Sequence, residues 1–567
     1  MDRPWTRTYG AGVPHEIDAN AYPSVMALFE TAVRRYGDRP AFECFGKTMS
    51  YAELDSASRA VAAWLQKRLE VKRGDRVALM VPNVFAFPIA MLGIHRAGAA
   101  QVNVNPLYTP GELAHQLHDA AVETIIVFAG STATLAEIVD KTPAKTVITV
   151  NLGDGSGLAI PSPAADPRLA GAARFADVLA EGAALELDPV ELTGNDALFL
   201  QYTGGTTGLS KGAVLTHRNL IANTEQFKAF MPEAIEPGKE VLILALPLYH
   251  IFGLMLMLAY MSVGAKGILI PNPRDVEGFC KAIKDAKFSV IAGVNTLFAG
   301  MMAAPGFKDI DLSNFKVAIG GGAAVIQATS EKWKSLTGRH ITEGYGLSET
   351  SPILCVNQMS VTDFTGTCGL PVPSTDIRLL DNDGNEVPEG EAGEIAARGP
   401  QVMQGYWRND DANRAAFTPD GFFRTGDIGV LTEGGFLKIV DRKKDMVIVS
   451  GFNVYPNEVE ATVTACPGVV ECACIGVPND KTGEAVRVFV VKAPDARLAE
   501  ADIVAHCRGH LAAYKVPRQI VFLEALPKSN VGKILRRELR NLVGGEEENH
   551  ACTEGLQRPH AEGLRRL

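Results

Sequence analysis

The chain has 567 residues, of which 47% are hydrophobic and 21% are charged. This composition is that of a folded globular protein and excludes a mostly disordered, collagen-like or coiled-coil chain, while the length indicates several compact units. The formal charge of −10 makes the protein as a whole a poor match for phosphate backbones, so we expect no nucleic-acid partner.

The first 150 residues alternate between helical and strand patterns. Apolar residues have helical spacing in two segments and form strand-like runs in four others: 51–68 and 88–98, then 76–81, 100–104, 123–129 and 145–150. Strands that alternate with helices predict parallel sheets with helical cover. Residues 151–190 are rich in Gly, Pro and Ala and predict an irregular surface segment, after which the alternation resumes to about residue 330.

One apolar run raises the question of a membrane span. Residues 241–265 contain no charged side chain and are long enough to cross a bilayer. Pro247 would break a spanning helix near its start, and His250 lies inside the run. A buried strand, a turn and a core helix explain the run as well, and this interpretation keeps the flanking α/β segments in one compartment.

The second half of the chain changes character twice. Residues 375–445 are dense in Gly, Asp and short β-branched runs and predict a smaller β-rich unit. The charged cluster 441–445, DRKKD, separates two apolar runs and predicts a linker, followed by a small α+β domain. From residue 544 the tail has no apolar periodicity and is expected to be mobile.

The cysteines and the N-terminus bear on the compartment. Nine cysteines, an odd number, are spread along the chain without a C-x-x-C pair, which favours free thiols in a reducing compartment. The first ten residues hold no apolar signal-peptide core. We therefore expect a cytoplasmic protein.

The strongest motif is YTGGTTGLSKG, residues 202–212, which follows a strand-like run. Glycines let backbone N–H groups approach phosphate oxygens closely, threonine hydroxyls add donors, and Lys211 adds a positive charge. The order Ser210-Lys211-Gly212 departs from the Gly-Lys-Ser/Thr of a Walker A loop. A polar turn without a ligand is the plain alternative, but the composition favours a nucleotide-phosphate loop.

This loop resembles the phosphate-loop signature of adenylate-forming enzymes, the superfamily of acyl-CoA synthetases, luciferases and adenylation domains. Four further segments resemble its other motifs in the same order: GGGAA (320–324), EGYGLSET (343–350), RTGD (424–427) and KSNVGK (528–533). The segment 420–444 resembles the fatty-acyl-CoA synthetase signature, and together with NVNPLYTPGEL, ALPLYHIFGL, GVNTLF, GLPVPST and SGFNVYPNEVE it resembles bacterial long-chain fatty-acid–CoA ligases. The resemblance runs from about residue 20 to residue 543.

The resemblance implies an activity, a fold and a set of partners. The activity is ligation of a long-chain fatty acid to coenzyme A, with ATP and Mg²⁺, through an acyl-adenylate, in fatty-acid degradation. The fold is α/β, with a large N-terminal lobe of parallel-sheet subdomains plus a β-rich subdomain, and a small mobile α+β C-terminal domain. The implied limits are 1–440 for the AMP- and acyl-binding domain, 441–445 for a hinge, 446–543 for a catalytic lid and 544–567 for the tail. A homodimer and transient peripheral contact with the inner membrane are also implied.

Several alternatives stay open. The acid could be of medium chain length or aromatic, and the product could be a free acyl-AMP that is passed to a carrier protein. A catalytically silent acyl- or nucleotide-binding protein is a further alternative, which the charged motif residues disfavour.

The resemblance assigns roles in the large lobe. Lys211 would be catalytic and would hold phosphates together with the loop, and His250 would border the acyl carboxylate. Thr203 and Glu349 match the magnesium positions, where Mg²⁺ needs few protein oxygens beside substrate phosphates. The remaining nucleotide-binding positions of this lobe are Tyr202, Thr203, Gly204, Gly205, Thr206, Thr207, Gly208, Gly322, Glu343, Gly344, Tyr345 and Ser348. The apolar stretch 254–261 would form a wall of the acyl pocket or, alternatively, plain core.

The resemblance also assigns roles toward the C-terminus. Asp427 and Arg442 would bind the ribose, since a carboxylate can accept both ribose hydroxyls. Lys533 would bridge the attacking carboxylate and the α-phosphate, where negative charge accumulates. Lys444 would be the hinge residue, and Gly451 and Phe452 would face the thiol of coenzyme A. The following LRRELR, residues 535–540, would be a solvated helix face or, less readily, a site for the 3′-phosphate of coenzyme A.

Overall fold

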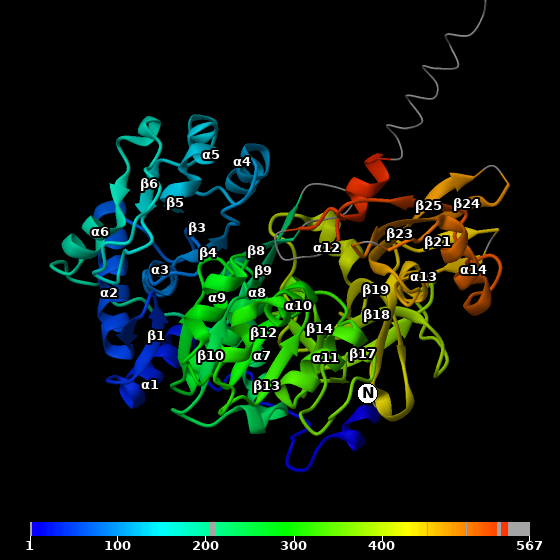
Figure 1. The fold of residues 1–567 in the computed structure, drawn as a ribbon. Helices are drawn as coiled ribbons and strands as arrows, with labels where there is room; N and C mark the ends of the chain where they lie inside the picture. The colour runs from blue at the N-terminus through cyan, green and yellow to red at the C-terminus, as the bar shows by residue number, and fades with distance from the viewer. Residues whose placement is uncertain are drawn as a thin grey trace, which may run out of the picture. The chain divides into compact units, whose positions relative to one another are not determined.

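The computed structural model describes residues 3–203, 210–450, 452–479, 481–494, 496–529 and 534–542. The chain divides into two compact units (Figure 1). The first comprises Met1–Thr425 and Val430–Ile439, and the second comprises Gly426–Gly429 and the chain from Val440 onward.

The first unit contains a seven-stranded sheet in the order β7-β6-β5-β3-β4-β8-β9. All neighbouring strands are parallel except β8 and β9, which form an antiparallel pair. The strands are β3 (Arg76–Met80), β4 (Ala100–Asn103), β5 (Thr124–Phe128), β6 (Thr146–Val150), β7 (Ala173–Arg174), β8 (Ala197–Thr203) and β9 (Lys211–Thr216). The strands β3 to β6 confirm the four runs predicted from the sequence.

A nine-stranded sheet forms the second layer of strands, in the order β16-β15-β14-β13-β12-β10-β11-β1-β2. Its centre, from β14 to β1, is parallel, and both edges are antiparallel. The strands are β1 (Pro40–Cys44), β2 (Lys47–Ser50), β10 (Val241–Leu244), β11 (Lys266–Leu269), β12 (Val290–Gly293), β13 (Val317–Gly320), β14 (Ile341–Gly346), β15 (Ile353–Val356) and β16 (Leu370–Pro371).

Helices connect the two sheets and cover their other faces. In the connecting layer, α3 packs on β3 and β4, α8 packs on β10 and β11, and α1, α2 and α7 pack against these helices and one another. These helices are α1 (Val25–Tyr36), α2 (Tyr51–Leu69), α3 (Ala86–Arg96), α7 (His217–Phe230) and α8 (Ile251–Ser262). The outer faces carry α4 (Pro110–Asp119) and α5 (Thr132–Ala136) on one sheet, and α9 (Val276–Ile283), α10 (Asn295–Ala303) and α11 (Gln327–Thr337) on the other.

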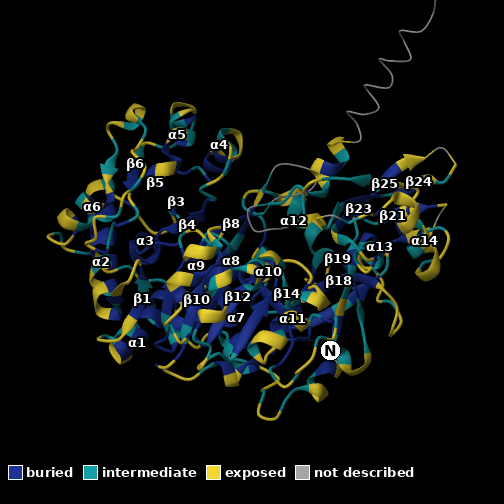
Figure 2. Ribbon diagram, viewed as in Figure 1, coloured by how far each residue is buried: buried dark blue, intermediate teal, exposed yellow. Residues whose placement is uncertain are grey.

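The apolar run 241–265 is the buried strand, turn and helix that the sequence favours over a membrane span. It forms β10 and α8, and residues 251–261 of α8 are all buried (Figure 2). Among the described residues, no helix combines the length and the apolar character needed to cross a membrane.

The segment 151–190 is not irregular throughout, which corrects the prediction. It contains β7 and the helix α6 (Phe175–Gly182), which buries Phe175 and Val178. The helix lies so close to α2 that a Cβ on Gly182 would be 2.0 Å from the carbonyl oxygen of Ala60. Glycine therefore permits a close contact between the two helices here. Because glycine has a low helix propensity, the sequence pattern did not predict this helix.

A four-stranded sheet, β17-β18-β19-β20, forms the β-rich part predicted within 375–445. Its strands are β17 (Asp376–Leu380), β18 (Gly393–Arg398), β19 (Phe423–Leu431) and β20 (Leu437–Arg442), and the short helix α12 (Asp410–Ala416) precedes β19. Parts of β19 and β20 belong to the second unit.

The second unit is an α+β domain built on the strand order β22-β21-β24-β23, with β25 paired parallel to β24. Its elements are β21 (Val447–Val449), β22 (Phe452–Val454), α13 (Pro456–Thr464), β23 (Val469–Asn479), β24 (Gly483–Lys492), α14 (Glu500–His510) and β25 (Gln519–Phe522). The tail predicted from residue 544 lies outside the described residues.

Candidate active site

The predicted phosphate loop joins two antiparallel strands. Thr203 ends β8 and is paired with Lys211, the first residue of β9, so the two residues flank the predicted loop at the same end of the hairpin. The buried Tyr202 points elsewhere, because its hydroxyl donates a 2.5 Å hydrogen bond to Asp119 Oδ2. Gly204, Gly205, Thr206, Thr207 and Gly208 lie outside the described residues.

Glu349, a predicted magnesium ligand, is buried next to this hairpin. It belongs to the short 3₁₀ turn η7 (Ser348–Thr350), which contacts β8 and β9. Its Oε1 accepts a 2.9 Å hydrogen bond from the hydroxyl of Tyr406. The ammonium of Lys211 lies 5.0 Å from the centre of the Tyr406 ring. The fold thus brings Lys211 and Glu349, 138 positions apart in the printed sequence, onto the same tyrosine. The half-buried Ser348 is the neighbour of Glu349 in this turn.

Four of the predicted nucleotide-binding residues lie at the carboxyl ends of two adjacent parallel strands. Glu343, Gly344 and Tyr345 belong to β14, and exposed Gly322 follows the neighbouring strand β13 at a positive φ of 77°. Residues Gly320 and Glu343 are partners across these strands. Because the carboxyl ends of parallel strands meet at one edge of the sheet, the structure places the four predicted residues together.

Glu343 carries an unusual carboxyl group. It is buried, and its Oε2 has no hydrogen-bond partner among the described residues. Burial raises the pKa of Glu343 to about 8, which the backbone N–H groups of Gly366 and Thr365 only partly oppose. The group is therefore protonated in the folded protein near neutral pH.

We expect Glu343→Gln to remove a pH dependence of stability. Between the pKa of an ordinary carboxyl and about 8, the folded protein holds a proton that the unfolded chain has released, so stability falls as pH rises. The limiting slope is about 1.4 kcal/mol per pH unit. Thermal melting from pH 6 to pH 9 should show the variant gaining on the wild type as pH rises. The exposed Glu331→Gln is the control, and parallel profiles for all three proteins would contradict the prediction.

His250 is the N-cap of α8, immediately after the turn that follows β10. Its Nδ1 accepts a 3.3 Å hydrogen bond from the backbone N–H of Phe252. The turn is held by the buried side chain of Asn83, which donates to the carbonyls of Leu244 and Leu246 and accepts from the N–H of Leu248. Asn83 thus positions the loop that carries His250, a function that no local sequence pattern indicates.

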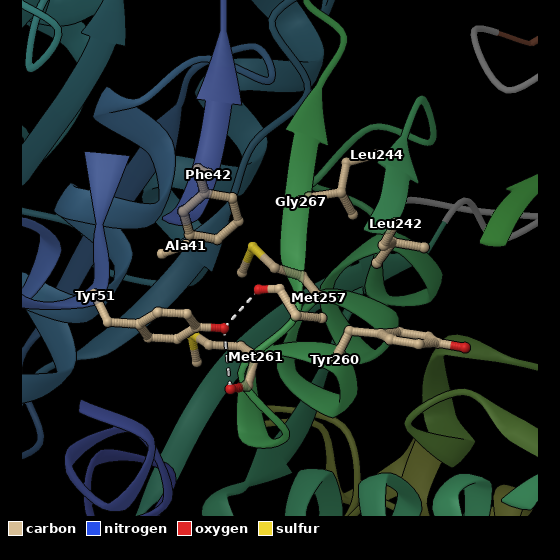
Figure 3. Close-up of a pocket in the computed structure, with 10 residues that line it drawn as sticks. Ala41, Phe42, Tyr51, Leu242, Leu244, Met257, Tyr260, Met261 and Gly267 are labelled. Carbon is tan, nitrogen blue, oxygen red and sulfur yellow. Dashed lines mark hydrogen bonds between the residues drawn. The ribbon is translucent and has the colours of Figure 1, made fainter. Parts of the chain in front are cut away.

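The predicted acyl wall 254–261 is packed in the core. Met257, Tyr260 and Met261 of α8 are among the residues that line a cavity of about 10 Å³ beside the strands β1, β10 and β11. Figure 3 shows these side chains with Tyr51 and Phe42 opposite Met257. The hydroxyl of Tyr51 closes one side by donating to the carbonyls of Met261 and Ala265. A cavity of this size holds one water molecule at most, so it provides no room for an alkyl chain.

The predicted ribose residues meet in the second unit. Asp427 is buried on β19, and its Oδ1 lies 3.3 Å from Nε of Arg442 on β20. Lys444 follows two residues later, and partial burial together with the charge of Arg442 lowers the pKa of its ammonium to about 8. The structure therefore groups Asp427, Arg442 and Lys444 in a cluster of charged side chains.

The first and last residues of the predicted linker 441–445 are buried. Asp441 is fully buried and accepts 2.7 Å hydrogen bonds from the backbone N–H groups of Arg442 and Asn457. Asp445 is also buried and pairs with Arg540 at 2.8 Å and Arg536 at 3.6 Å. The segment is thereby fixed to other parts of the second unit.

Phe452 lies in the hairpin of β21 and β22 and is 58% exposed. Its ring stacks on that of Tyr514, with centres 5.0 Å apart. The neighbouring Gly451, predicted to face the same ligand, is outside the described residues, as is the predicted catalytic Lys533.

The prediction of a solvated face for LRRELR is wrong for Arg536. Its side chain is only 17% exposed, and its guanidinium binds both carboxylate oxygens of Glu460, at 2.7 and 2.8 Å, besides Asp445 and the side chain of Asn457. The Nε of Arg536 is buried and has no hydrogen-bond partner among the described residues, so this side chain belongs to the interior of the second unit rather than to a solvated face.

Comparison with known proteins decides the family. The model for the AMP-binding enzyme family matches residues 29–407, and that for the AMP-binding enzyme C-terminal domain matches residues 458–533. The chain belongs to the AMP-binding enzyme family. It is 47% identical to a long-chain-fatty-acid–CoA ligase of Salmonella typhimurium, over 97% of this chain and 100% of that protein. A ligase of the same name from Haemophilus influenzae is 43% identical, over 95% and 98% of the two chains.

Solved structures of AMP-binding enzymes have the same fold. The crystal structure of ATP-bound MatB from Rhodopseudomonas palustris aligns with a TM-score of 0.81 and 31% identity, over 92% of this chain and 99% of that one. The α/β fold class predicted from the sequence is confirmed by this likeness and by the sheets described above.

Proposed function

We propose that this protein is a long-chain fatty-acid–CoA ligase. It converts ATP, a long-chain fatty acid and coenzyme A into acyl-CoA, AMP and diphosphate through an acyl-adenylate, and so feeds fatty-acid degradation. The proposal is supported by the full-length likeness to ligases of that name. The observation that carries it is the arrangement of Thr203, Lys211 and the buried Glu349 around one hairpin.

The chemistry needs positioning and charge neutralisation rather than a covalent enzyme intermediate. Lys211 and the loop residues hold the β- and γ-phosphates, and His250 borders the acyl carboxylate. Tyr345, with Gly322, Glu343 and Gly344, receives adenine, while Asp427 and Arg442 bind the ribose. Lys533 neutralises the charge that develops when the carboxylate attacks the α-phosphorus.

The residues present fit a magnesium ion. Glu349 offers a buried carboxylate and Thr203 a hydroxyl, and such hard oxygen donors in small number suit Mg²⁺ that is bound mainly by phosphates. When bound, the ion neutralises charge on the phosphates of ATP. The chain's own residues do the rest: they orient the nucleotide and hold the acid beside it.

Other parts of the proposal concern organisation and location. The large domain is 1–440, the hinge 441–445, with Lys444 as its pivot, and the catalytic lid 446–543, on which Gly451 and Phe452 face coenzyme A. The protein is a cytoplasmic homodimer that makes transient contact with the inner membrane when it collects its substrate.

A profile of acid substrates tests the function. ATP-dependent thioester formation should be fastest with palmitate or oleate, slower with octanoate and weakest with benzoate. Activity with octanoate or benzoate but none with palmitate would overturn the substrate class. Release of acyl-AMP without thioester, in the presence of coenzyme A, would indicate an acyl-AMP ligase instead.

A further inference from the structure

A short segment, residues 403–407, connects the phosphate-loop hairpin to the turn that bears Glu349. On one side, the N–H of Val214 donates to the carbonyl of Gly405 at 2.9 Å, and the N–H of Trp407 donates to Gly212 at 2.7 Å. On the other side, the N–H of Met403 donates to the carbonyl of Glu349 at 2.8 Å. This connecting segment therefore adds backbone bonds to both halves of the predicted metal and phosphate site.

The side chain of Tyr406, in the middle of the connecting segment, makes the same connection. Its hydroxyl donates to Glu349 Oε1 at 2.9 Å, and its ring lies 5.0 Å from the ammonium of Lys211. A hydrogen bond to a charged acceptor is stronger than one between neutral groups, and the ring face attracts a cation.

The backbone of Tyr406 is held in turn by Asn413 of α12. The side-chain Oδ1 of Asn413 accepts from the N–H of Tyr406 at 2.6 Å, and its Nδ2 donates to the Tyr406 carbonyl at 3.1 Å. The preceding Gly405 has a φ of 145°, and a Cβ there would be 2.8 Å from Asn413 Oδ1. The ring is thus fixed at its backbone as well as at its hydroxyl.

We propose that Tyr406 is a positioning residue for the magnesium site. This inference rests on the proposed function. Its hydroxyl engages one oxygen of Glu349, while a carboxylate has a second oxygen with which to bind a cation. A carboxylate held in one orientation loses less conformational freedom when Mg²⁺ binds. The ring face meanwhile keeps Lys211 beside the same phosphates.

The test compares Tyr406→Phe with the wild type in direct binding of ATP. Calorimetric titration with Mg²⁺ and with a chelator gives the factor by which the metal tightens nucleotide binding. The variant keeps the ring but loses the hydroxyl, so we expect this factor to fall on the order of tenfold, with binding in chelator almost unchanged. The Mg²⁺ concentration for half-maximal adenylation should rise in parallel.

Tyr9→Phe is the matched control. The Tyr9 hydroxyl donates a 2.5 Å hydrogen bond to the carbonyl of Pro371, and none of the predicted site residues takes part. Both variants should lose a similar amount of thermal stability, but only Tyr406→Phe should change the effect of magnesium. An unchanged magnesium factor in Tyr406→Phe would overturn the proposal and leave the hydroxyl a purely structural role.

Two further measurements keep the result interpretable. In a Glu349→Gln background, Tyr406→Phe should change the magnesium factor no further, because the hydroxyl acts through that carboxylate. If Tyr406→Phe fails to fold, Asn413→Ala should produce the same shift in weaker form, and no shift in that variant would overturn the proposal. A wild-type protein that forms no acyl-adenylate would contradict the proposed function itself, which separates the two failures.

Discussion

Replacing Lys533 with alanine should abolish acyl-adenylate formation while leaving ATP binding intact. The ammonium is expected to act where the attacking carboxylate and the α-phosphate crowd negative charge together, and such a group acts mainly on the transition state. The expected loss of the adenylation rate is on the order of 10²–10³-fold. The second half-reaction, started from supplied acyl-adenylate and coenzyme A, should proceed at nearly the wild-type rate.

Lys533 lies outside the described residues, but the structure describes the residues on either side of it and provides a control variant. The described residues on either side of Lys533 are joined, because Lys528 and Ile534 form an antiparallel bridge and the N–H of Leu535 donates to the carbonyl of Pro527. Lys528 is already paired with Glu471 at 2.6 Å. Lys528→Ala is therefore the matched control, with adenylation expected to remain within about threefold of the wild type. Full adenylation by Lys533→Ala would refute the assigned role.

Replacing Arg536 with methionine should strongly destabilise the second unit. The substitution leaves the carboxylate of Glu460, whose side chain is only 16% exposed, without its guanidinium, and removal of one partner from a largely buried ion pair costs about 3–5 kcal/mol. Burial already raises the pKa of Glu460, which Arg536 opposes. The loss should be smaller when Glu460→Gln is added, since no buried charge is then left alone.

Arg540→Met provides the comparison for this experiment. Arg540 pairs with Asp445 at 2.8 Å, but its side chain is 37% exposed, against 17% for Arg536. A partly exposed pair contributes about 1 kcal/mol at most, so this variant should melt close to the wild type. Urea titration monitored by a probe in the second unit measures both, and equal losses for the two variants would show that burial does not set the cost.

The order of helices and strands in the large unit, and the family, can be predicted from local sequence patterns. From residue 51 to residue 150, apolar runs of strand length alternate with segments whose apolar residues have helical spacing. This pattern lies within each segment, so it predicts strands and helices without knowledge of the tertiary contacts. The phosphate-loop motif can also be predicted from the sequence, because its glycines, threonines and Lys211 lie within eleven consecutive residues. The helix 175–182 was not predicted because it is short and ends on a glycine. The need for glycine at that position is explained only by the close contact with α2.

The tertiary structure decided which distant side chains act together. Tyr406 is 57 positions from Glu349 and Arg536 is 76 positions from Glu460, and no local spacing relates either pair. LRRELR has the composition of a solvated face, yet Arg536 is largely withdrawn from solvent because α13 brings the carboxylate of Glu460 to it. Likewise Asn83 holds the turn before His250 through three long-range hydrogen bonds. The periodicity of apolar residues indicates which face of a segment is buried. The hydrogen-bond partner of a buried polar group, in contrast, depends on which distant segments the fold brings together.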